Sequence, residues 1–260
     1  MLRRKRPSVD SAVTQTLVVW DFDWSLINEN SDTYVLEQVD AQVASRMEKK
    51  LLDEGSGIGW TQLMDWSVGE LHKAGHTPQA IRKALVGIPV LGGALAAFDA
   101  AKAAGAQQRI LSDANSVYIS TILEARGLSD AVPVVVTNPA AFDDEGRLHI
   151  KPLVPKELPH ACPRCPPNLC KGAVLESWLE ELRPRRCIYV GDGGGDFCPA
   201  TRLRPQDVVL ARRSPHDGLL RKCRTEGQVQ AEIVEWGGDA DAEGAALRAG
   251  MEKAVPVSSQ

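Results

Sequence analysis

The chain has 260 residues, 43% of them hydrophobic, so it is long enough to bury a sizeable core as a globular protein. Its formal net charge of -4 gives no positive field for a nucleic acid, and no apolar run approaches the roughly 20 residues that cross a bilayer. We therefore expect neither a nucleic acid nor a membrane as a partner.

Residues 1–15 begin with a basic stretch that has no apolar segment of the kind found in a secretory signal. We expect a disordered tail there. The six cysteines all lie in the second half of the chain, unlike the evenly spread framework of a small secreted domain. A reducing compartment fits this distribution better, and we expect a cytoplasmic protein.

An apolar run at residues 17–20 ends in two acids, Asp21 and Asp23. Its β-branched and aromatic residues predict a buried parallel strand, whose carboxyl end is where α/β sheets place ligands. Alternate side chains of an extended chain share a face, so both carboxylates are expected to point toward one ligand. Such a pair can combine a nucleophile with a proton donor, although two acids can also simply cap a turn.

Residues 30 to about 90 contain helical patterns but no convincing strand. Apolar residues recur there at helical spacing, and glycines near residue 57 and Thr77-Pro78 separate the helices. We interpret residues 29–91 as a small helical cap inserted after the first strand, between the core segments 16–28 and 92–236.

Strands and helices alternate through the rest of the core. Apolar runs predict strands at residues 108–113, 132–136, 186–190 and 207–210, and a hairpin at 142–150. This alternation predicts an α/β fold with a doubly wound parallel sheet. Residues 237–260 carry one weak helical pattern, and we expect a C-terminal tail.

Four short polar pieces lie at strand ends or helix starts of the predicted sheet. They are Asp21 with Asp23, Ser112 with Asp113, Lys171, and Asp192 with Asp196. A phosphoryl-transfer site needs such a nucleophile, proton donor, donors to phosphoryl oxygens and carboxylates for a divalent metal. Two carboxylates about 4 Å apart repel by roughly 4 kcal/mol at an effective dielectric near 20, so crowded acids need a cation. Oxygen ligands and a phosphate favour Mg²⁺.

The order of these pieces resembles the haloacid dehalogenase (HAD) superfamily of phosphotransferases. The matching motifs, which span the core from about 16 to 211, are Asp-x-Asp-x-Ser at 21–25, Ser112, Lys171 and Gly-Asp-Gly-x-x-Asp at 191–196. The resemblance implies a HAD-like Rossmannoid core, with Asp21 as the nucleophile that forms an aspartyl-phosphate and Asp23 as general acid, then base. It implies catalytic roles for Ser112 and Lys171 as well. It also implies Mg²⁺ ligation by Asp21, the Asp23 carbonyl and Asp192, with Asp196 in support.

Further motifs look like those of the phosphoethanolamine/phosphocholine phosphatase family, whose relatives act on pyridoxal phosphate, thiamine monophosphate or pyrophosphate. They lie at residues 29–32, 111–115, 160–171 and 191–199. The resemblance implies that Asp32 and Asp113 lie near the leaving group, where two carboxylates favour a cationic head group. Ser25 and Trp24 are further candidate substrate contacts. Position 24 usually holds a smaller or a charged residue in the family, and the Trp24 ring could also simply pack under the cap.

A loop before Lys171 contains residue types that bind structural zinc. The candidate ligands are His160, Cys162, Cys165 and Cys170, and a Cys-x-x-Cys pair is a common zinc half-site. The irregular spacing of the other two ligands, and the need for the same loop to deliver Lys171, instead favour a plain reduced loop or a redox-sensitive thiol pair. Both alternatives stay open.

The sequence therefore predicts a Mg²⁺-dependent phosphatase, a hydrolase of small phosphomonoesters. Phosphocholine or phosphoethanolamine is the favoured substrate, and thiamine monophosphate, pyridoxal phosphate or pyrophosphate is the alternative. A phosphomutase would use the same aspartyl-phosphate but return the phosphoryl group to its substrate. A binding protein that had lost turnover would be expected to lack the nucleophile or Lys171, and both are present.

Overall fold

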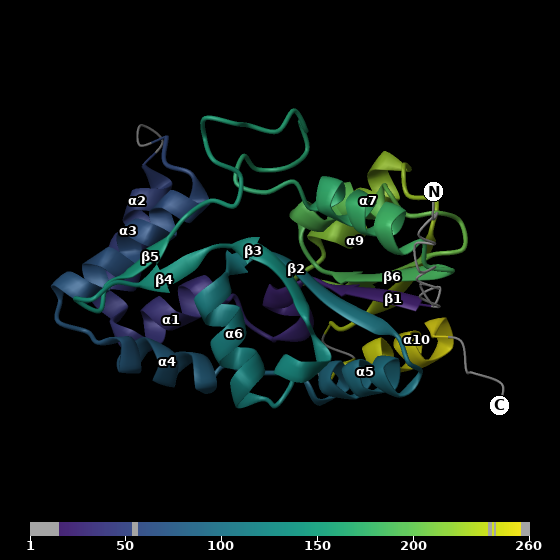
Figure 1. Ribbon diagram of the computed structural model, residues 1–260, viewed down its shortest axis with the longest axis horizontal. Coiled ribbons are helices and arrows are strands. Elements are labelled where there is room, and N and C mark those ends of the chain that lie inside the picture. The colour runs from purple at the N-terminus through teal and green to yellow at the C-terminus, as the bar shows by residue number, and fades with distance from the viewer. Residues whose placement is uncertain (1–15, 54–56, 239–240, 242, 256–260) are drawn as a thin grey trace, which may run out of the picture.

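A six-stranded parallel sheet forms the centre of the molecule (Figure 1). The computed structural model describes residues 16–53, 57–238, 241 and 243–255, so the predicted tail at 1–15 lies outside the described residues. The sheet has the strand order β3-β2-β1-β6-β7-β8. The strands are β1 (Thr16–Trp20), β2 (Gln107–Asn115), β3 (Val134–Asn138), β6 (Arg186–Gly191), β7 (Val208–Arg212) and β8 (Glu232–Trp236).

The order of the strands reverses at β1. β2 and β3 follow on one side of it, and β6, β7 and β8 follow on the other, with every neighbouring pair parallel. The predicted doubly wound α/β class is confirmed. The carboxyl ends of β1 and β6 form the switch point at which such sheets bind ligands.

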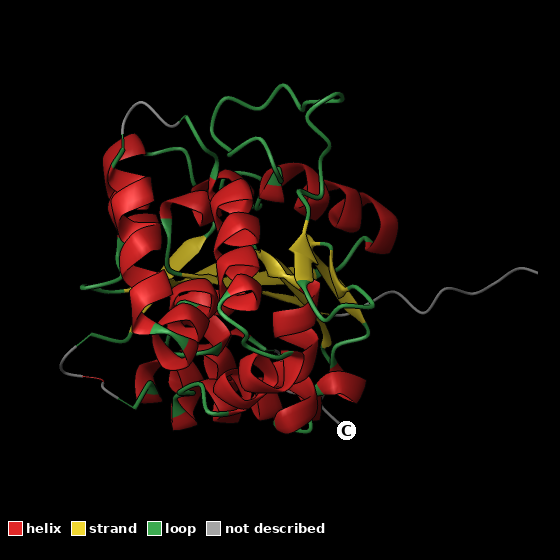
Figure 2. Cartoon of the chain, turned by 90° about the vertical axis from the view of Figure 1, so that its left-hand side faces the viewer, coloured by secondary structure: helices red, strands yellow, loops and turns green. Residues whose placement is uncertain are grey.

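Helices cover both faces of the sheet (Figure 2). One face carries α5 (Gly92–Ala103), α6 (Ser116–Ala125) and α10 (Ala245–Ala254), and the other carries α7 (Lys171–Leu182), α8 (Phe197–Ala200) and α9 (Gly218–Glu226). In β1, Val18 and Trp20 belong to the first core, whereas Leu17 and Val19 belong to the second. Because both faces are buried, the strand is apolar from Leu17 to Trp20.

Among the described residues, four α-helices lie between β1 and α5, at one end of the sheet (Figure 1). They are α1 (Ser31–Val39), α2 (Ala41–Leu52), α3 (Trp60–Lys73) and α4 (Pro78–Val86). We call these four helices the helical block. They occupy the predicted cap, whose boundaries at 29 and 91 stay a prediction.

The predicted hairpin at 142–150 is confirmed, and it packs on the helical block. Its strands are β4 (Ala140–Phe142) and β5 (Leu148–Ile150), which pair antiparallel. Asp65 of α3 accepts hydrogen bonds from Arg147 Nη2 at 2.9 Å and from the amide of Ile150 at 2.8 Å. A segment from the core half of the chain therefore fastens to the helical block.

The C-terminal segment differs from the predicted tail. In the described part of this segment, α10 packs on α5, with Leu247 and Met251 fully buried. Gly93 permits the close approach of the two segments, because a Cβ there would lie 2.0 Å from the carbonyl oxygen of Gly244. β8, which the sequence analysis did not predict, adds an edge strand with exposed glutamates. None of the helices in the described residues is long and apolar enough to cross a membrane.

Candidate active site

The switch point brings together acids and a lysine from three distant segments. Asp21 follows β1, Lys171 begins α7, and Asp192 and Asp196 follow β6. Lys171 Nζ donates to Asp21 Oδ1 at 2.6 Å and to Asp196 Oδ1 at 2.8 Å. Asp113 Oδ1, at the end of β2, lies 3.9 Å from the same nitrogen. Pieces that the sequence analysis identified one by one therefore share a single site.

Asp196 is fixed by four protein donors. Its Oδ1 accepts from Lys171 and, at 2.7 Å, from the hydroxyl of Tyr189. Its Oδ2 accepts from the amides of Asp192 at 3.2 Å and Gly193 at 3.0 Å. A Cβ at Gly191 would lie 2.8 Å from Asp196 Cγ, so a glycine is required there. Both oxygens of Asp196 are thus used in holding Lys171 and the loop after β6.

The carboxylates of Asp21, Asp192 and Asp196 form a compact group. One oxygen from each lies within 4.8 Å of the others. Burial raises the pKa of Asp21 to about 8, repulsion by Asp196 adds to this rise, and Lys171 opposes it. Burial, followed by repulsion from Asp21 and Asp196, also raises the pKa of Asp192 well above its usual range. The raised pKa values indicate that Lys171 alone does not balance the crowded carboxylates, and an all-oxygen set of this kind fits a hard divalent cation.

Lys171 is nearly completely buried, and it is held in the charged form. Burial alone would lower its pKa, but Asp196 and Asp21 raise it well above the usual range. A positive charge therefore lies beside Asp21, and a phosphoryl-transfer site needs such a charge next to its nucleophile.

Asp23 faces the start of the helical block. Its Oδ1 accepts a hydrogen bond of 3.0 Å from the amide of Ser31, the first residue of α1. The extended backbone ends at Asp21, and a distorted helical turn follows at Phe22–Leu26. The two acids consequently have different hydrogen-bond partners, and their shared orientation toward one ligand stays a prediction.

Asp32 and Trp60 form a polar contact inside the helical block. Trp60 Nε1, in α3, donates to Asp32 Oδ2 at 2.8 Å. Burial raises the pKa of Asp32 to about 7, although the hydrogen bond from Trp60 acts in the opposite direction. Asp113 is the more exposed of the two predicted leaving-group contacts, with 45% of its side chain accessible. The sequence analysis missed Trp60, because no local pattern links positions 28 residues apart.

Ser25 and Ser112 are both buried. Ser25 Oγ donates a long hydrogen bond of 3.5 Å to Asp21 Oδ2. Ser112 Oγ accepts a hydrogen bond of 3.2 Å from the amide of Ala114. The hydroxyl is therefore held in the C-terminal half of β2.

Trp24 has a left-handed backbone, with φ of 56°, which is rare for a bulky residue. Its ring stacks on that of His216, with centroids 3.7 Å apart, and the guanidinium of Arg212 lies 5.6 Å from the ring centroid. Arg212 also donates to the carbonyl oxygen of Trp24 and to Asn28. Trp24 thus has a packing role, and its contact with a substrate stays a prediction. The sequence analysis did not single out Arg212.

The structure gathers three of the four predicted zinc ligands and leaves the fourth aside. Cys162, Cys165 and Cys170 converge together with Cys198. His160 instead donates its Nε2 hydrogen to the carbonyl oxygen of Pro166 at 2.9 Å. Cys198 takes the place that the sequence analysis gave to His160.

Solved structures show the class of this fold. A phosphoserine phosphatase, described as a phospho-aspartyl intermediate analogue, matches with a TM-score of 0.53 and 16% identity over 85% of this chain and 93% of its own. A HAD family hydrolase from Salmonella enterica serovar Typhi matches with a TM-score of 0.57 and 14% identity over 89% and 69% of the two chains. The fold is that of the HAD phosphatases.

Sequence comparison then gives the family. Residues 16–249 match the family model described as Putative Phosphatase. A thiamine phosphate phosphatase-like protein of Arabidopsis thaliana is 35% identical over 86% of this chain and 91% of its own. The pyridoxal phosphate phosphatase PHOSPHO2 of Bos taurus is 32% identical over 85% and 92%. An inorganic pyrophosphatase 2 of Arabidopsis thaliana is 34% identical over 76% and 71%. The chain belongs to this family and is a phosphatase, a phosphoric monoester hydrolase, with the fold of the HAD phosphatases.

Proposed function

We propose that this phosphatase hydrolyses a small phosphomonoester in two displacements at phosphorus, with Asp21 as the nucleophile. The observation that carries the proposal is the bridge of Lys171 Nζ between Asp21 and Asp196 at the switch point of the sheet. Lys171 lies where it can balance the charge of the attacking carboxylate and of the phosphoryl oxygens.

In the first displacement, an oxygen of Asp21 bonds to phosphorus while the bond from phosphorus to the ester oxygen breaks. Asp23 gives its proton to that ester oxygen, which leaves as an alcohol. In the second displacement, water attacks phosphorus and loses a proton to Asp23, and the bond to Asp21 breaks. Inorganic phosphate leaves, and both acids return to their initial state. We assign to Ser112 the donation of its hydroxyl hydrogen to a phosphoryl oxygen.

A Mg²⁺ ion fits the oxygen donors of this site. The carboxylates of Asp21 and Asp192 and the backbone carbonyl of Asp23 would hold it, while Asp196 supports the site because its oxygens already accept from protein donors. When bound, the ion neutralises charge on the phosphoryl oxygens and on the crowded carboxylates.

We place the leaving group against Asp32 and Asp113, with Ser25 and Trp24 as further candidate contacts. Two carboxylates favour a leaving group with a positive charge, which supports phosphocholine or phosphoethanolamine as the substrate. Thiamine monophosphate also has a cationic leaving group, and a relative named for thiamine phosphate keeps it as the second candidate. Pyridoxal phosphate and pyrophosphate, for which other relatives are named, lack a comparable fixed cation.

The test is release of inorganic phosphate from these substrates by the purified protein. Chelation should abolish activity, and added Mg²⁺ should restore it. Asp21→Asn should lower kcat by about 1,000-fold or more, because the amide cannot replace the carboxylate as nucleophile. The matched control, Asp130→Asn, changes an exposed acid far from the site and should stay within about twofold of the wild type. Full activity of Asp21→Asn would overturn the proposal.

A further inference from the structure

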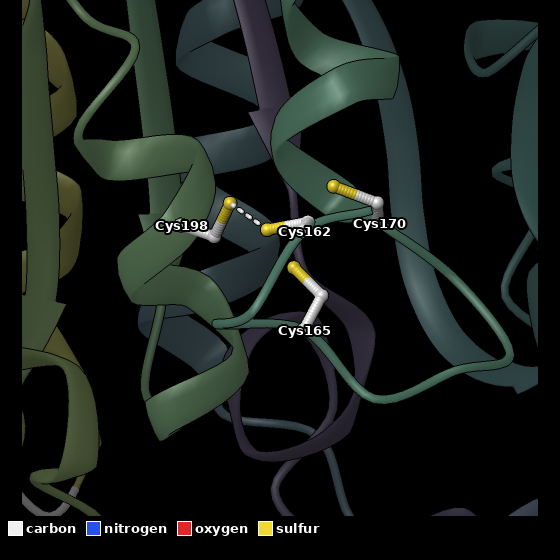
Figure 3. A group of neighbouring side chains, drawn as sticks. All are labelled: Cys162, Cys165, Cys170 and Cys198. Carbon is white, nitrogen blue, oxygen red and sulfur yellow. Dashed lines mark hydrogen bonds between the residues drawn. The ribbon is translucent and has the colours of Figure 1, made fainter. Parts of the chain in front are cut away.

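Four cysteine sulfurs lie close together at the start of α7 (Figure 3). They belong to Cys162, Cys165 and Cys170, in the loop before α7, and to Cys198, in α8. The four Sγ atoms all lie within 4.8 Å of one another. We propose that these four cysteines bind one structural Zn²⁺ ion.

The spacing of the sulfurs agrees with a tetrahedral ion and not with a disulfide. A Zn–S bond of about 2.3 Å in a tetrahedron places neighbouring sulfurs about 3.8 Å apart. Cys162 Sγ and Cys198 Sγ are 3.7 Å apart. A disulfide would need about 2.05 Å, and all six cysteines, each in the described part of the chain, are free.

The chemistry of the group favours zinc over the Mg²⁺ of the active site. Four sulfur ligands without a carboxylate form a soft set, whereas Mg²⁺ prefers oxygen. The set also fills all four tetrahedral positions, which is typical of structural zinc and leaves no open position for catalysis. A cluster of several irons needs its thiolates further apart than a single ion does, so we commit to one ion and to zinc.

The location of the four cysteines indicates that the ion would order the loop before Lys171. Residues 151–170, all of which the structure describes, form no helix or strand. Such a long irregular segment needs another source of order. Cys170 directly precedes Lys171, and Cys198 lies two residues after Asp196. An ion held by both would therefore fix the backbone on either side of the 2.8 Å contact between Lys171 and Asp196.

The sequence spacing could not identify this ligand set. His160, the ligand expected from the spacing, is bound to the Pro166 carbonyl, and the fourth sulfur comes from a residue 36 positions beyond Cys162. The spacing in the loop is irregular because the fourth proposed ligand, Cys198, comes from α8 and not from the loop.

The experiment measures zinc in the purified full-length protein by elemental analysis after washing with excess Mg²⁺. The wild type should hold about one Zn²⁺ per chain. Cys162→Ser and Cys165→Ser change half-exposed loop residues and should lose the zinc. The matched control Cys223→Ser, which changes a buried cysteine outside the group, should keep it. Asp192→Asn should keep it too, which separates the thiolate site from the carboxylate site.

A second measurement does not depend on the folding of any variant. Wild-type protein stripped of metal and titrated with Co²⁺ should develop the visible absorption of a tetrahedral cobalt thiolate, and Zn²⁺ should abolish it. The loop 151–170 should become more sensitive to proteolysis when the ion is removed. Protein that neither contains nor takes up zinc, that contains iron instead, or whose Cys162→Ser and Cys165→Ser variants retain zinc would overturn the proposal.

Discussion

Asp32 belongs to the helical block, yet it is as buried as the acids at the strand ends. Its exposed fraction is 4%, against 5% for Asp21. Its hydrogen bond from Trp60 joins two helices of the block, so the carboxylate is held in a defined orientation. A buried carboxylate with one fixed donor keeps strong attraction for a cation that enters beside it.

Asp32→Asn should raise KM for phosphocholine or thiamine monophosphate by about tenfold and change KM for glycerol phosphate little, because only the cationic substrates lose an ionic contact. In the wild type, KM for the cationic substrate should fall relative to KM for glycerol phosphate as the pH rises through about 7, because Asp32 ionises there. Comparison with Asp32→Asn at the same pH values removes the contribution from ionisation of the phosphates themselves. Equal effects of the substitution on both substrates would remove Asp32 from recognition.

The hairpin of β4 and β5 ties the core half of the chain to α3. Arg147 and Asp65 form an ion pair with two hydrogen bonds, and the amide of Ile150 donates a third hydrogen bond to the same carboxylate. Burial would raise the pKa of Asp65, but Arg147 and the Ile150 amide together lower it below its usual value. One carboxylate of α3 thus accepts three hydrogen bonds from the hairpin.

Asp65→Asn should lower the free energy of unfolding by about 1–2 kcal/mol, because charged hydrogen bonds are replaced by weaker ones. A lowered folded-state pKa stabilises the protein above the unfolded value of 3.8, and this contribution disappears as the pH falls through the folded value. The difference between variant and wild type should therefore be constant above about pH 5 and shrink below about pH 4. Denaturant unfolding at several pH values measures it, with the exposed Asp99→Asn as the control. A difference that grows in acid would contradict the ion pair.

The arrangement of the sheet explains which parts of the fold could be predicted from the sequence. Strands buried on both faces, such as β1 and β6, contain continuous apolar runs and were therefore predicted. β8 was missed because Glu232 and Glu235 face solvent at the sheet edge. α10 was missed as a core helix because its buried residues are too few to give a strong helical pattern.

The residues of the candidate site likewise divide into those that could be predicted from the sequence and those that could not. Acids at strand ends could be predicted to meet, because parallel strands end at one edge of the sheet. Tyr189, Trp60 and Cys198 could not, because each reaches its partner only after the chain has folded. The sequence predicted which groups meet at the switch point, and the structure adds the groups that hold them in place.

The central claim is that the phosphoryl group is transferred to Asp21 before water attacks it. Each in-line displacement inverts phosphorus, so two displacements restore the original configuration. The direct measurement is hydrolysis of a substrate that is chiral at phosphorus, in isotopically labelled water, followed by analysis of the configuration of the phosphate released. We predict net retention for the wild-type protein. Net inversion would mean that water attacks the substrate directly, and it would contradict the role of Asp21 as nucleophile.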